Sequence, residues 1–559
     1  MSDKGSGPDE PYSGTDAASI ASDELDKDAF DAHNPILDQV EPLEQYRPGG
    51  FIPLNPGDSL DKGRFLVLQK LGFGRTATVW LCQENETGKW VAIKVYSDEA
   101  SDNAAREVQA TRILRHASTG SQGEGGIGRL ALATEFFYVK SANGRHVCGV
   151  LPVLGPSIMD WRRYDIMGDV DRTMGLCRQA TEGMEYIHSK GICHGDFRPQ
   201  NILMKLRPGC LDDLNANDMW KLLGEPGKMR APKVKGTSNR HMPEWIITPM
   251  SPHVLSKYAT DDIGILDFGD AYTPPSTLKR HKGLGIPKAL DIPGPYAAPE
   301  AAFHSPRLFG KESDVWALAC TLLDVRRGVP LGGSTEDTIR NTEWLVGGPL
   351  PFPYRPAAER MLAEAKARRD NDSRESELAE ETIASLSESE RNALARTEEG
   401  RRLRTLMPPL QKVIDNAQRA QKRNFSYNDP LEVLVGKYMM DSERGLGAGI
   451  ALKALKHPLP QEEVVSFVDL LRNVFKYFPE ERFTAGEVLE HRWLGLGRGR
   501  KVSATLDKQS KDIPLLVWAA IIYLAMIISM FLTRRILVNV EHRAAEQWSG
   551  LVVACEQCS

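Results

Sequence analysis

Three short apolar runs between residues 65 and 95 constrain the fold more than any other feature of this sequence. The runs FLVLQKL, TATVWLC and KWVAIKV are rich in β-branched and aromatic residues, and the turn sequences GFG and NETG separate them. Strands joined by such short connections pair in antiparallel fashion. The sequence therefore predicts an antiparallel sheet that begins at residue 65.

The stretches that follow complete a small lobe. Residues 101–116 contain no glycine or proline and predict one helix. Two further runs, GRLALATEFFYV and RHVCGVLPVLG, flank the turn sequence SANG and predict two more strands. We therefore expect a lobe of five strands and one helix over residues 61–154.

Residues 155–494 carry mainly helical patterns and predict a larger second lobe. Apolar side chains recur at spacings of three and four in residues 169–191, and residues 313–325 are apolar on nearly all sides. Two stretches interrupt these patterns. Residues 205–260 mix glycine, proline and charge and predict a long loop insert. Residues 356–425 are highly charged, and we interpret them as a solvated helical insert or as a surface that docks a partner.

Composition excludes several classes of protein. The 559 residues have a formal net charge of -5, so nucleic-acid binding through bulk charge is not expected. The eight cysteines are scattered, which excludes a disulfide framework and favours a reducing compartment. Residues 1–60 are rich in Asp, Ser, Gly and Pro and predict an acidic disordered tail, and no secretory signal is expected before it.

A long apolar run near the C-terminus predicts a membrane segment. Residues 513–532 contain no charge, and a helix of this length spans about 30 Å. A buried core helix is the alternative. We expect a basic linker over 495–512, a single-pass transmembrane helix over 513–532 and a short tail over 533–559. The folded domain would then be cytosolic, or would lie in the cytoplasm or nucleus if the helix is not inserted.

A glycine-rich turn lies between the first two strands. Gly72 and Gly74 allow backbone N–H groups to approach a phosphate, although an ordinary hairpin turn explains them equally well. Lys94 lies in the third strand within reach of the same phosphates, and Glu107 in the following helix is its ion-pair candidate. A lysine after an apolar strand is more often a surface residue, so this pair depends on the motifs below.

Three further motifs follow in order. The stretch HGDFRPQN contains Asp196, which can accept the proton of a hydroxyl group, and Asn201, which can hold a metal ion. Asp267 begins the sequence DFG after an apolar run and is a candidate Mg²⁺ ligand. Glu300 in the sequence APE requires a buried cation, for which Arg482 is the candidate.

The five motifs in this order make the sequence similar to the eukaryotic protein kinase superfamily, over roughly residues 61–494. The resemblance implies a bilobal α+β protein kinase fold, with ATP and Mg²⁺ as cofactors. It implies catalytic roles for Lys94, Glu107, Asp196 and Arg198. It implies nucleotide binding by Gly72, Gly74, Ala77, Val79, Ala92, Lys94, Pro152, Leu154 and Leu203. It implies metal binding by Asn201 and Asp267, and structural roles for Glu300, Asp314 and Arg482.

A narrower resemblance is to the SR-protein-kinase family, in its divergent fungal form. The segments GFGRTATVWLC and NGRHVCGVLPVLGPSI and the long insert before DFG carry it. This resemblance implies a Ser/Thr protein kinase that acts on serines in Arg/Ser-rich splicing factors. Its partners would be protein substrates and, through the C-terminal helix, a membrane, with no direct binding of nucleic acid.

The chain departs from the kinase pattern at four positions. Ala77 replaces the third glycine, Arg198 replaces a lysine, and Thr111 is polar where an apolar side chain is usual. Gly195 replaces the arginine that pairs with an activation-segment phosphate in many kinases, so we expect activity without phosphorylation there. Because no metal ligand, base or lysine is lost, we favour an active kinase over the alternative of a membrane-tethered pseudokinase scaffold.

Overall fold

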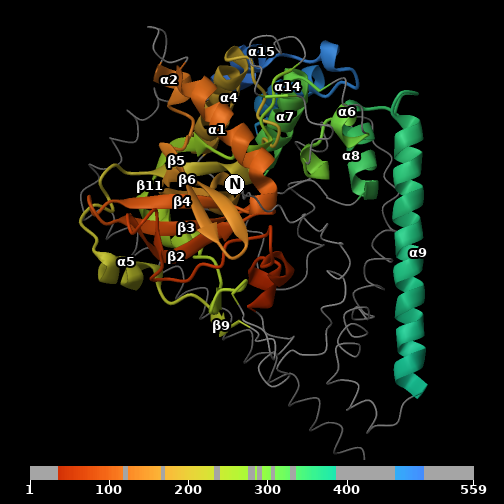
Figure 1. Ribbon diagram of the computed structural model, residues 1–559. Helices are drawn as coiled ribbons and strands as arrows, with labels where there is room; N and C mark the ends of the chain where they lie inside the picture. The colour runs from red at the N-terminus through yellow and green to blue at the C-terminus, as the bar shows by residue number, and fades with distance from the viewer. Residues whose placement is uncertain are drawn as a thin grey trace, which may run out of the picture. The chain divides into compact units, whose positions relative to one another are not determined.

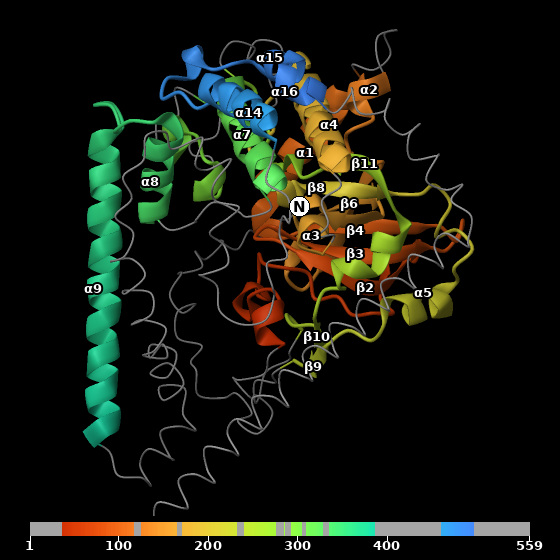
Figure 2. The ribbon, with the colours of Figure 1, turned by 180° about the vertical axis from the view of Figure 1, so that it is seen from behind.

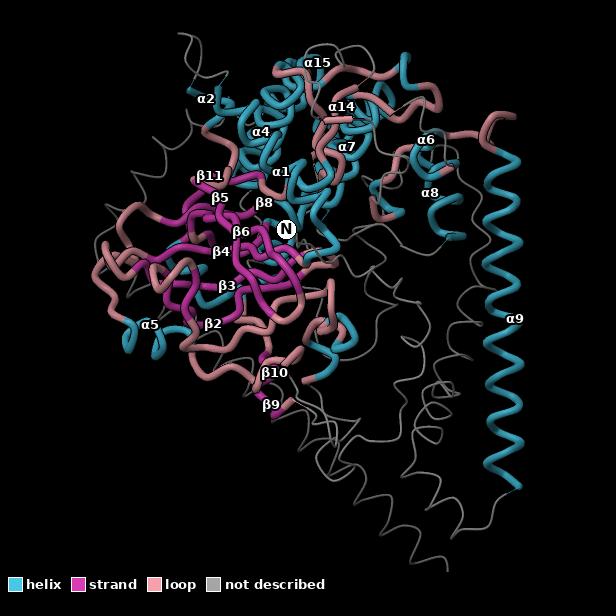
Figure 3. Tube along the Cα trace, in the orientation of Figure 1, coloured by secondary structure: helices cyan, strands magenta, loops and turns pink. Residues whose placement is uncertain are grey.

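The computed structural model describes most of the chain between residues 36 and 496. The described residues are 36–116, 124–164, 170–231, 240–274, 284–285, 292–303, 309–327, 335–385 and 460–496. Figure 3 shows most of the strands gathered in one lobe and the larger helices outside it. Among the described residues, the bilobal arrangement predicted from the sequence is confirmed.

A six-stranded antiparallel sheet forms the small lobe, with strand order β1-β2-β3-β4-β6-β5 (Figure 1). Its strands are β1 Ser59–Leu60, β2 Phe65–Phe73, β3 Ala77–Glu84, β4 Trp90–Tyr96, β5 Glu135–Ser141 and β6 Gly144–Pro152. Five of them correspond to the five predicted strands, and the sixth is the two-residue β1, which pairs with β2. The predicted helix is α1, Ser101–His116.

Alternate side chains of this sheet form its core. Phe65 and Val67 on β2 are buried with Trp80 and Cys82 on β3, and Ile93 on β4 joins the same cluster. Successive side chains of a strand point to opposite faces, so this spacing of two places one apolar face inward. The core fixes the register of β2 to β4, the strands that carry the glycine-rich turn and Lys94.

The larger lobe begins with a second small sheet and continues with helices (Figure 2). The sheet has the order β11-β8-β7, from Ala259–Ile265, Ile202–Leu206 and Leu154–Ser157. The helices are α2 Glu124–Ile127, α3 Ile158–Tyr164, α4 Val170–Ser189, α6 Pro299–Ala302, α7 Lys311–Arg327, α8 Thr335–Val346, α9 Arg355–Ser385, α14 Gln461–Val474, α15 Ala485–Glu490 and α16 Arg492–Gly495. The α7 helix is the buried central helix expected from its apolar sequence.

The acidic tail predicted over residues 1–60 is partly wrong, because residues 36–60 are ordered. Its buried side chains include Val40, Tyr46 and Phe51. They pack in one cluster with Met229 and Ile246, which belong to the insert that follows β8. Apolar residues in the tail are too sparse to predict a core by themselves, and their partners lie almost two hundred positions away.

The insert over residues 205–260 is also more structured than the predicted loop. It contains a helix, α5 Ala216–Leu223, and a hairpin formed by β9 Lys228–Arg230 and β10 Trp245–Ile247. Buried Met219 and Leu223 on α5 pack with Leu81 and Trp90 of the small lobe. The insert therefore bridges from β8 in the large lobe to the sheet of the small lobe.

A buried ion pair joins the tail segment, the sheet and the insert. The Lys70 ammonium on β2 donates to the Glu41 carboxylate, and the Tyr46 hydroxyl donates to the same carboxylate. Lys70 Nζ also donates to the carbonyl oxygen of Ile247, at 3.3 Å. The Lys70 and Glu41 side chains are 1% and 0% exposed. Charges this deeply buried need such partners, because desolvation is costly.

The predicted transmembrane helix over 513–532 requires a correction to the fold class. The segment itself lies outside the described residues, and among those described none of the helices combines the length and apolar character needed to cross a bilayer. The longest described helix, α9, has 31 residues but is dense in charge. It confirms helical structure in the first part of the charged insert predicted over 356–425. The fold that the described residues support is the bilobal kinase fold.

Candidate active site

A cluster of three charged side chains lies where the two lobes meet. The Lys94 ammonium on β4 is 2.8 Å from Glu107 Oε2 on α1 and 2.7 Å from Asp267 Oδ1. The Lys94 and Glu107 side chains are 9% and 4% exposed, whereas the Asp267 side chain is 36% exposed. The ion pair predicted between Lys94 and Glu107 is therefore confirmed, and the structure adds Asp267 as a second carboxylate on the same lysine.

The electrostatics of this cluster keep the lysine charged. Burial lowers the pKa of Lys94, but the charges of Asp267 and Glu107 outweigh burial and hold this pKa above its ordinary value. Burial is the largest influence on the pKa of Asp267 and raises it, but the charge and the hydrogen bond of Lys94, together with weaker contributions that include a hydrogen bond from the Gly269 backbone, outweigh burial and lower this pKa. For Glu107, burial dominates and raises the pKa. One cation thus faces two carboxylates, and when both are ionised the cluster attracts a further cation.

Tyr96 is a member of this cluster that sequence analysis did not find. Its hydroxyl donates to Glu107 Oε2, and its ring lies 4.7 Å from the Lys94 ammonium. Because Tyr96 is two residues after Lys94 on β4, both side chains are on the same face of the sheet. That alternation is the one sequence pattern from which the position of Tyr96 can be derived.

The stretch HGDFRPQN forms a tight loop that ends in a short 3₁₀ turn, Pro199–Asn201, just before β8. Asn201 Nδ2 donates to Asp196 Oδ2 at 2.9 Å and to the Asp196 carbonyl oxygen at 2.8 Å. Arg198 Nε donates to the same Oδ2 at 3.0 Å. The other oxygen, Asp196 Oδ1, is buried and has no hydrogen-bond partner among the described residues. An unpartnered buried carboxylate oxygen is costly, so it marks a place where a donor from a substrate fits.

The family resemblance implies a catalytic role for Arg198. In the structure its guanidinium binds the Asp196 carboxylate, and its side chain is 28% exposed. Its positive charge therefore lies beside the candidate base.

The backbone of this loop is fixed by Asp314 of α7. Asp314 Oδ2 accepts from the His194 N–H at 2.6 Å, and Oδ1 accepts from the Gly195 N–H at 3.1 Å. Oδ2 also lies 3.0 Å from His188 Nε2. Asp314 is 1% exposed. These contacts agree with the structural role that the family resemblance implies for Asp314.

The glycine-rich turn leaves open space above its backbone. A Cβ atom added to Gly72 or Gly74 would meet no atom within 4 Å, so close packing does not require glycine at either position. Gly74 N–H bonds the Ala77 carbonyl oxygen at 2.8 Å, which closes the turn. Ala77 itself is 3% exposed and packs with Tyr96 under α1. Its side chain is therefore a core residue, and the predicted nucleotide contact of Ala77 would be made by its backbone.

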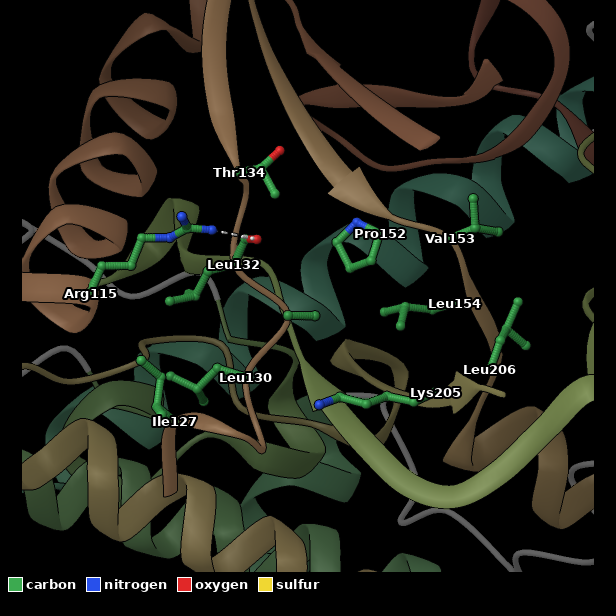
Figure 4. A pocket seen from close by; sticks show the side chains of 11 residues that line it. Arg115, Ile127, Leu130, Leu132, Thr134, Pro152, Val153, Leu154, Lys205 and Leu206 are labelled. Atoms are coloured by element: carbon green, nitrogen blue, oxygen red, sulfur yellow. Dashed lines mark hydrogen bonds between the residues drawn. The ribbon is translucent and has the colours of Figure 1, made fainter. Parts of the chain in front are cut away.

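The other predicted nucleotide contacts surround the junction of the lobes. Ala92 on β4 is buried and pairs with Leu151 on β6, and Leu203 lies on β8. Pro152 is the last residue of β6, and Leu154 is the first residue of β7. They also line a pocket of about 530 Å³, together with Arg115, Thr134 and Lys205 among others (Figure 4). None of the charged cluster around Lys94 lines this pocket, which is therefore separate from the site described above.

The predicted ion pair between Glu300 and Arg482 is confirmed. Arg482 Nη1 and Nη2 lie 2.7 Å and 2.8 Å from the two oxygens of Glu300. Both side chains are 0% exposed. Arg482 also donates to the carbonyl oxygens of Lys476 and Glu312, at 2.9 Å and 3.1 Å. The pair thus connects α6 to α7 and to the segment before α15.

Comparison with known proteins finds similarity to protein kinases. The protein kinase domain family matches residues 153–346. The chain is 31% identical to pig SRSF protein kinase 3 over 200 residues, which cover 35% of this chain and 35% of that protein. The chain resembles the SRSF protein kinases.

Two fungal relatives agree with this result. Identity to the serine/threonine-protein kinase SKY1 of Saccharomyces cerevisiae is 30%, over 30% of this chain and 23% of that kinase. Identity to the protein kinase dsk1 of Schizosaccharomyces pombe is 29%, over 32% of this chain and 33% of that kinase. The chain thus spans about a third or less of the length of these relatives.

Proposed function

We propose that this chain is a Ser/Thr protein kinase of the SR-protein-kinase type, which transfers the γ-phosphate of ATP to a protein hydroxyl group. The observation that supports the proposal best is the Lys94 ammonium held between Glu107 and Asp267. Phosphoryl transfer depends mainly on positioning and on charge stabilisation. A lysine fixed by two carboxylates is suited to orient the phosphates of a nucleotide.

The donor atoms at the site fit a divalent cation. Asp267 offers carboxylate oxygens, and Asn201 uses its amide nitrogen on Asp196, so its amide oxygen remains the atom suited to a metal. Oxygen ligands of this kind are those that Mg²⁺ prefers. Bound Mg²⁺ would supply positive charge that neutralises the transferring phosphate.

Asp196 is the proposed general base. Its Oδ1 is buried without a described partner, while Oδ2 is held by Asn201 and Arg198. The carboxylate is therefore fixed in orientation and presents one acceptor atom to a hydroxyl group. In the reaction, the serine oxygen bonds to the γ-phosphorus as the bond to ADP breaks, and Asp196 Oδ1 accepts the serine proton.

The proposed substrates are serines in Arg/Ser-rich protein segments. The support is the resemblance to the SRSF protein kinases. The pseudokinase alternative is less favoured, because Lys94 contacts both Glu107 and Asp267, and Asn201 contacts Asp196.

The substrate class can be tested with three matched peptides. An Arg/Ser-repeat peptide, a Lys/Ser repeat of equal charge and an acidic serine peptide are incubated with the full chain and ATP·Mg²⁺. We expect phosphate incorporation to be greatest for the Arg/Ser repeat. Equal or greater incorporation into the acidic peptide contradicts the substrate class, and no incorporation into any peptide contradicts the proposed activity.

A further inference from the structure

Helix α1 makes a second set of contacts besides the one from Glu107. Asn103 Nδ2 donates to the Gly269 carbonyl oxygen at 3.1 Å and to Asp270 Oδ1 at 3.0 Å. Residues three and four positions apart share one side of a helix, so Asn103 lies on the same side as Glu107. This side of α1 therefore contacts the lysine through Glu107 and the segment after Asp267 through Asn103.

Arg106 extends these contacts to a more distant part of the chain. Its Nη1 donates to the Ala271 carbonyl oxygen at 3.2 Å and to the Gly285 carbonyl oxygen at 2.9 Å. The Thr273 N–H donates to the Leu284 carbonyl oxygen at 3.1 Å, so the backbone around residue 273 lies beside the backbone around residue 284. One guanidinium thus ties both stretches of backbone to α1.

The HGDFRPQN loop approaches the segment after Asp267 closely at Gly195. Its φ angle is +84°, and a Cβ atom there would lie 2.2 Å from the Asp270 carbonyl oxygen. The close contact leaves no room for a side chain, and the positive φ angle also favours glycine. The backbone after DFG therefore packs directly against the loop that carries Asp196. The absence of an arginine at position 195 follows from this close approach.

Asp267 itself has a backbone conformation that needs support. Its φ angle of +68° lies in the left-handed region, which is unfavourable for a residue other than glycine. Such a conformation persists when its surroundings determine it. The Asn103 bond to Gly269, two residues later, and the Arg106 bond to Ala271 are the described contacts from α1 that fix the backbone beyond Asp267.

We propose that Asn103 and Arg106 are positioning residues, which hold the segment after Asp267 so that its carboxylate is set for metal binding. The acceptors of Arg106 are main-chain carbonyl groups, which are present whether or not the segment is phosphorylated. The cation missing at Gly195 is thus replaced in function by a cation on α1. This inference rests on the proposed kinase function and assigns residues that neither the motifs nor the comparisons identify.

The test compares Arg106→Met, Arg106→Lys and Asn103→Ala with a control, Arg112→Met. Arg112 lies on α1 and is exposed. Two quantities are measured in the full chain: hydrogen exchange of peptides covering residues 268–274, and calorimetric binding of ADP with Mn²⁺. We expect Arg106→Met and Asn103→Ala to speed exchange and to weaken metal-dependent ADP binding about tenfold. Arg106→Lys should show exchange rates and ADP binding between those of Arg106→Met and the wild type. Arg112→Met should match the wild type in both measurements.

Phosphate transfer is measured alongside. We expect kcat to fall and the Mg²⁺ concentration for half-maximal activity to rise in Arg106→Met, with the peptide KM unchanged. A wild-type chain without transfer contradicts the proposed function, while exchange and Mn²⁺·ADP binding still decide the positioning role. The positioning role would be overturned if Arg106→Met and Asn103→Ala both exchanged hydrogen and bound Mn²⁺·ADP as the wild type does. If Arg106→Met does not fold, Asn103→Ala alone decides, because it removes a neutral side chain.

Discussion

Two groups of charged side chains in this molecule both join carboxylates to a cation, but they differ in the number of partners and in exposure to solvent. Glu300 and Arg482 pair one to one, both at 0% exposure. Lys94 faces two carboxylates, and one of them, Asp267, is 36% exposed. In the first group the charges balance and solvent is excluded, so a ligand has neither an unpaired charge nor access there. The second keeps an excess of negative charge at an accessible edge, as a site that binds a metal and a nucleotide requires. The number of carboxylates per cation and the exposure of the side chains therefore distinguish the structural ion pair from the proposed catalytic cluster.

The largest expected effect on stability is at the closed pair. In Arg482→Met, Glu300 loses its countercharge in a dry environment, and we expect the free energy of unfolding to fall by about 3–5 kcal/mol. Urea unfolding of the full chain measures it. The matched control is Arg492→Met, where the arginine is 63% exposed and pairs with a half-exposed Asp469. A loss for Arg482→Met no greater than for the control would mean that the closed pair is not stabilising.

Lys94→Met tests the open cluster, where we expect loss of activity rather than loss of fold. Removing the ammonium should lower kcat by about 10²–10³-fold, because it is positioned to stabilise the phosphates. We expect the urea midpoint of Lys94→Met to lie close to that of the wild type. The midpoint of Arg482→Met should be lower than both. Asp267 can be solvated, and Glu107 can take up a proton. Undiminished kcat in a folded Lys94→Met protein would show that the cluster is structural.

The same variant gives a prediction for pH. The pKa of Glu107 is already above its ordinary value of 4.5 because of burial, and loss of Lys94 removes the charge that opposes this shift. A carboxyl group with a raised pKa in the folded state destabilises the fold as pH rises through that pKa. We therefore expect the stability gap between wild type and Lys94→Met to be larger at about pH 8 than at about pH 5.5. Urea midpoints at the two pH values measure it, and a gap that shrinks with rising pH contradicts the assignment.

A third buried charge group, around Glu41, sharpens the comparison with a smaller effect. Tyr46→Phe removes the hydroxyl that donates to Glu41 while the Lys70 ion pair remains. A hydrogen bond to a charged group contributes about 1.5–3 kcal/mol, and we expect a loss of unfolding free energy in this range. The control is Tyr138→Phe, since Tyr138 is 57% exposed. Equal midpoints for the two variants would show that the tail segment is not anchored by this network.

Sequence patterns predicted the catalytic cluster better than its surroundings. The motifs around Lys94, Asp196 and Asp267 are local and ordered along the chain, and the strands that carry them have clear alternation. The tail segment and the hairpin of the insert were not predicted, because they are buried against each other and lie almost two hundred positions apart in the sequence. The sequence also does not show that Asp267 shares Lys94 with Glu107, because this contact exists only in the folded chain.

The smallest expected effect concerns phosphorylation of the segment between Asp267 and Glu300. Because Gly195 offers no guanidinium and Arg106 binds carbonyl groups, phosphatase treatment should leave kcat unchanged. The measurement is kcat before and after treatment, with removal of phosphate checked by mass spectrometry. A treated enzyme that becomes inactive, and recovers on rephosphorylation, would contradict the account.

The most direct test of the central claim is phosphate transfer by Asp196→Asn. The amide keeps the size of the carboxylate and an oxygen for Asn201 and Arg198, but it cannot serve as a base. With ATP·Mg²⁺ and an Arg/Ser-repeat peptide, we predict that the wild type transfers phosphate to serine. Asp196→Asn should bind the nucleotide as tightly and transfer about 10²–10⁴-fold more slowly. Transfer by Asp196→Asn at the wild-type rate would contradict the assignment of Asp196 and the catalytic site built around it.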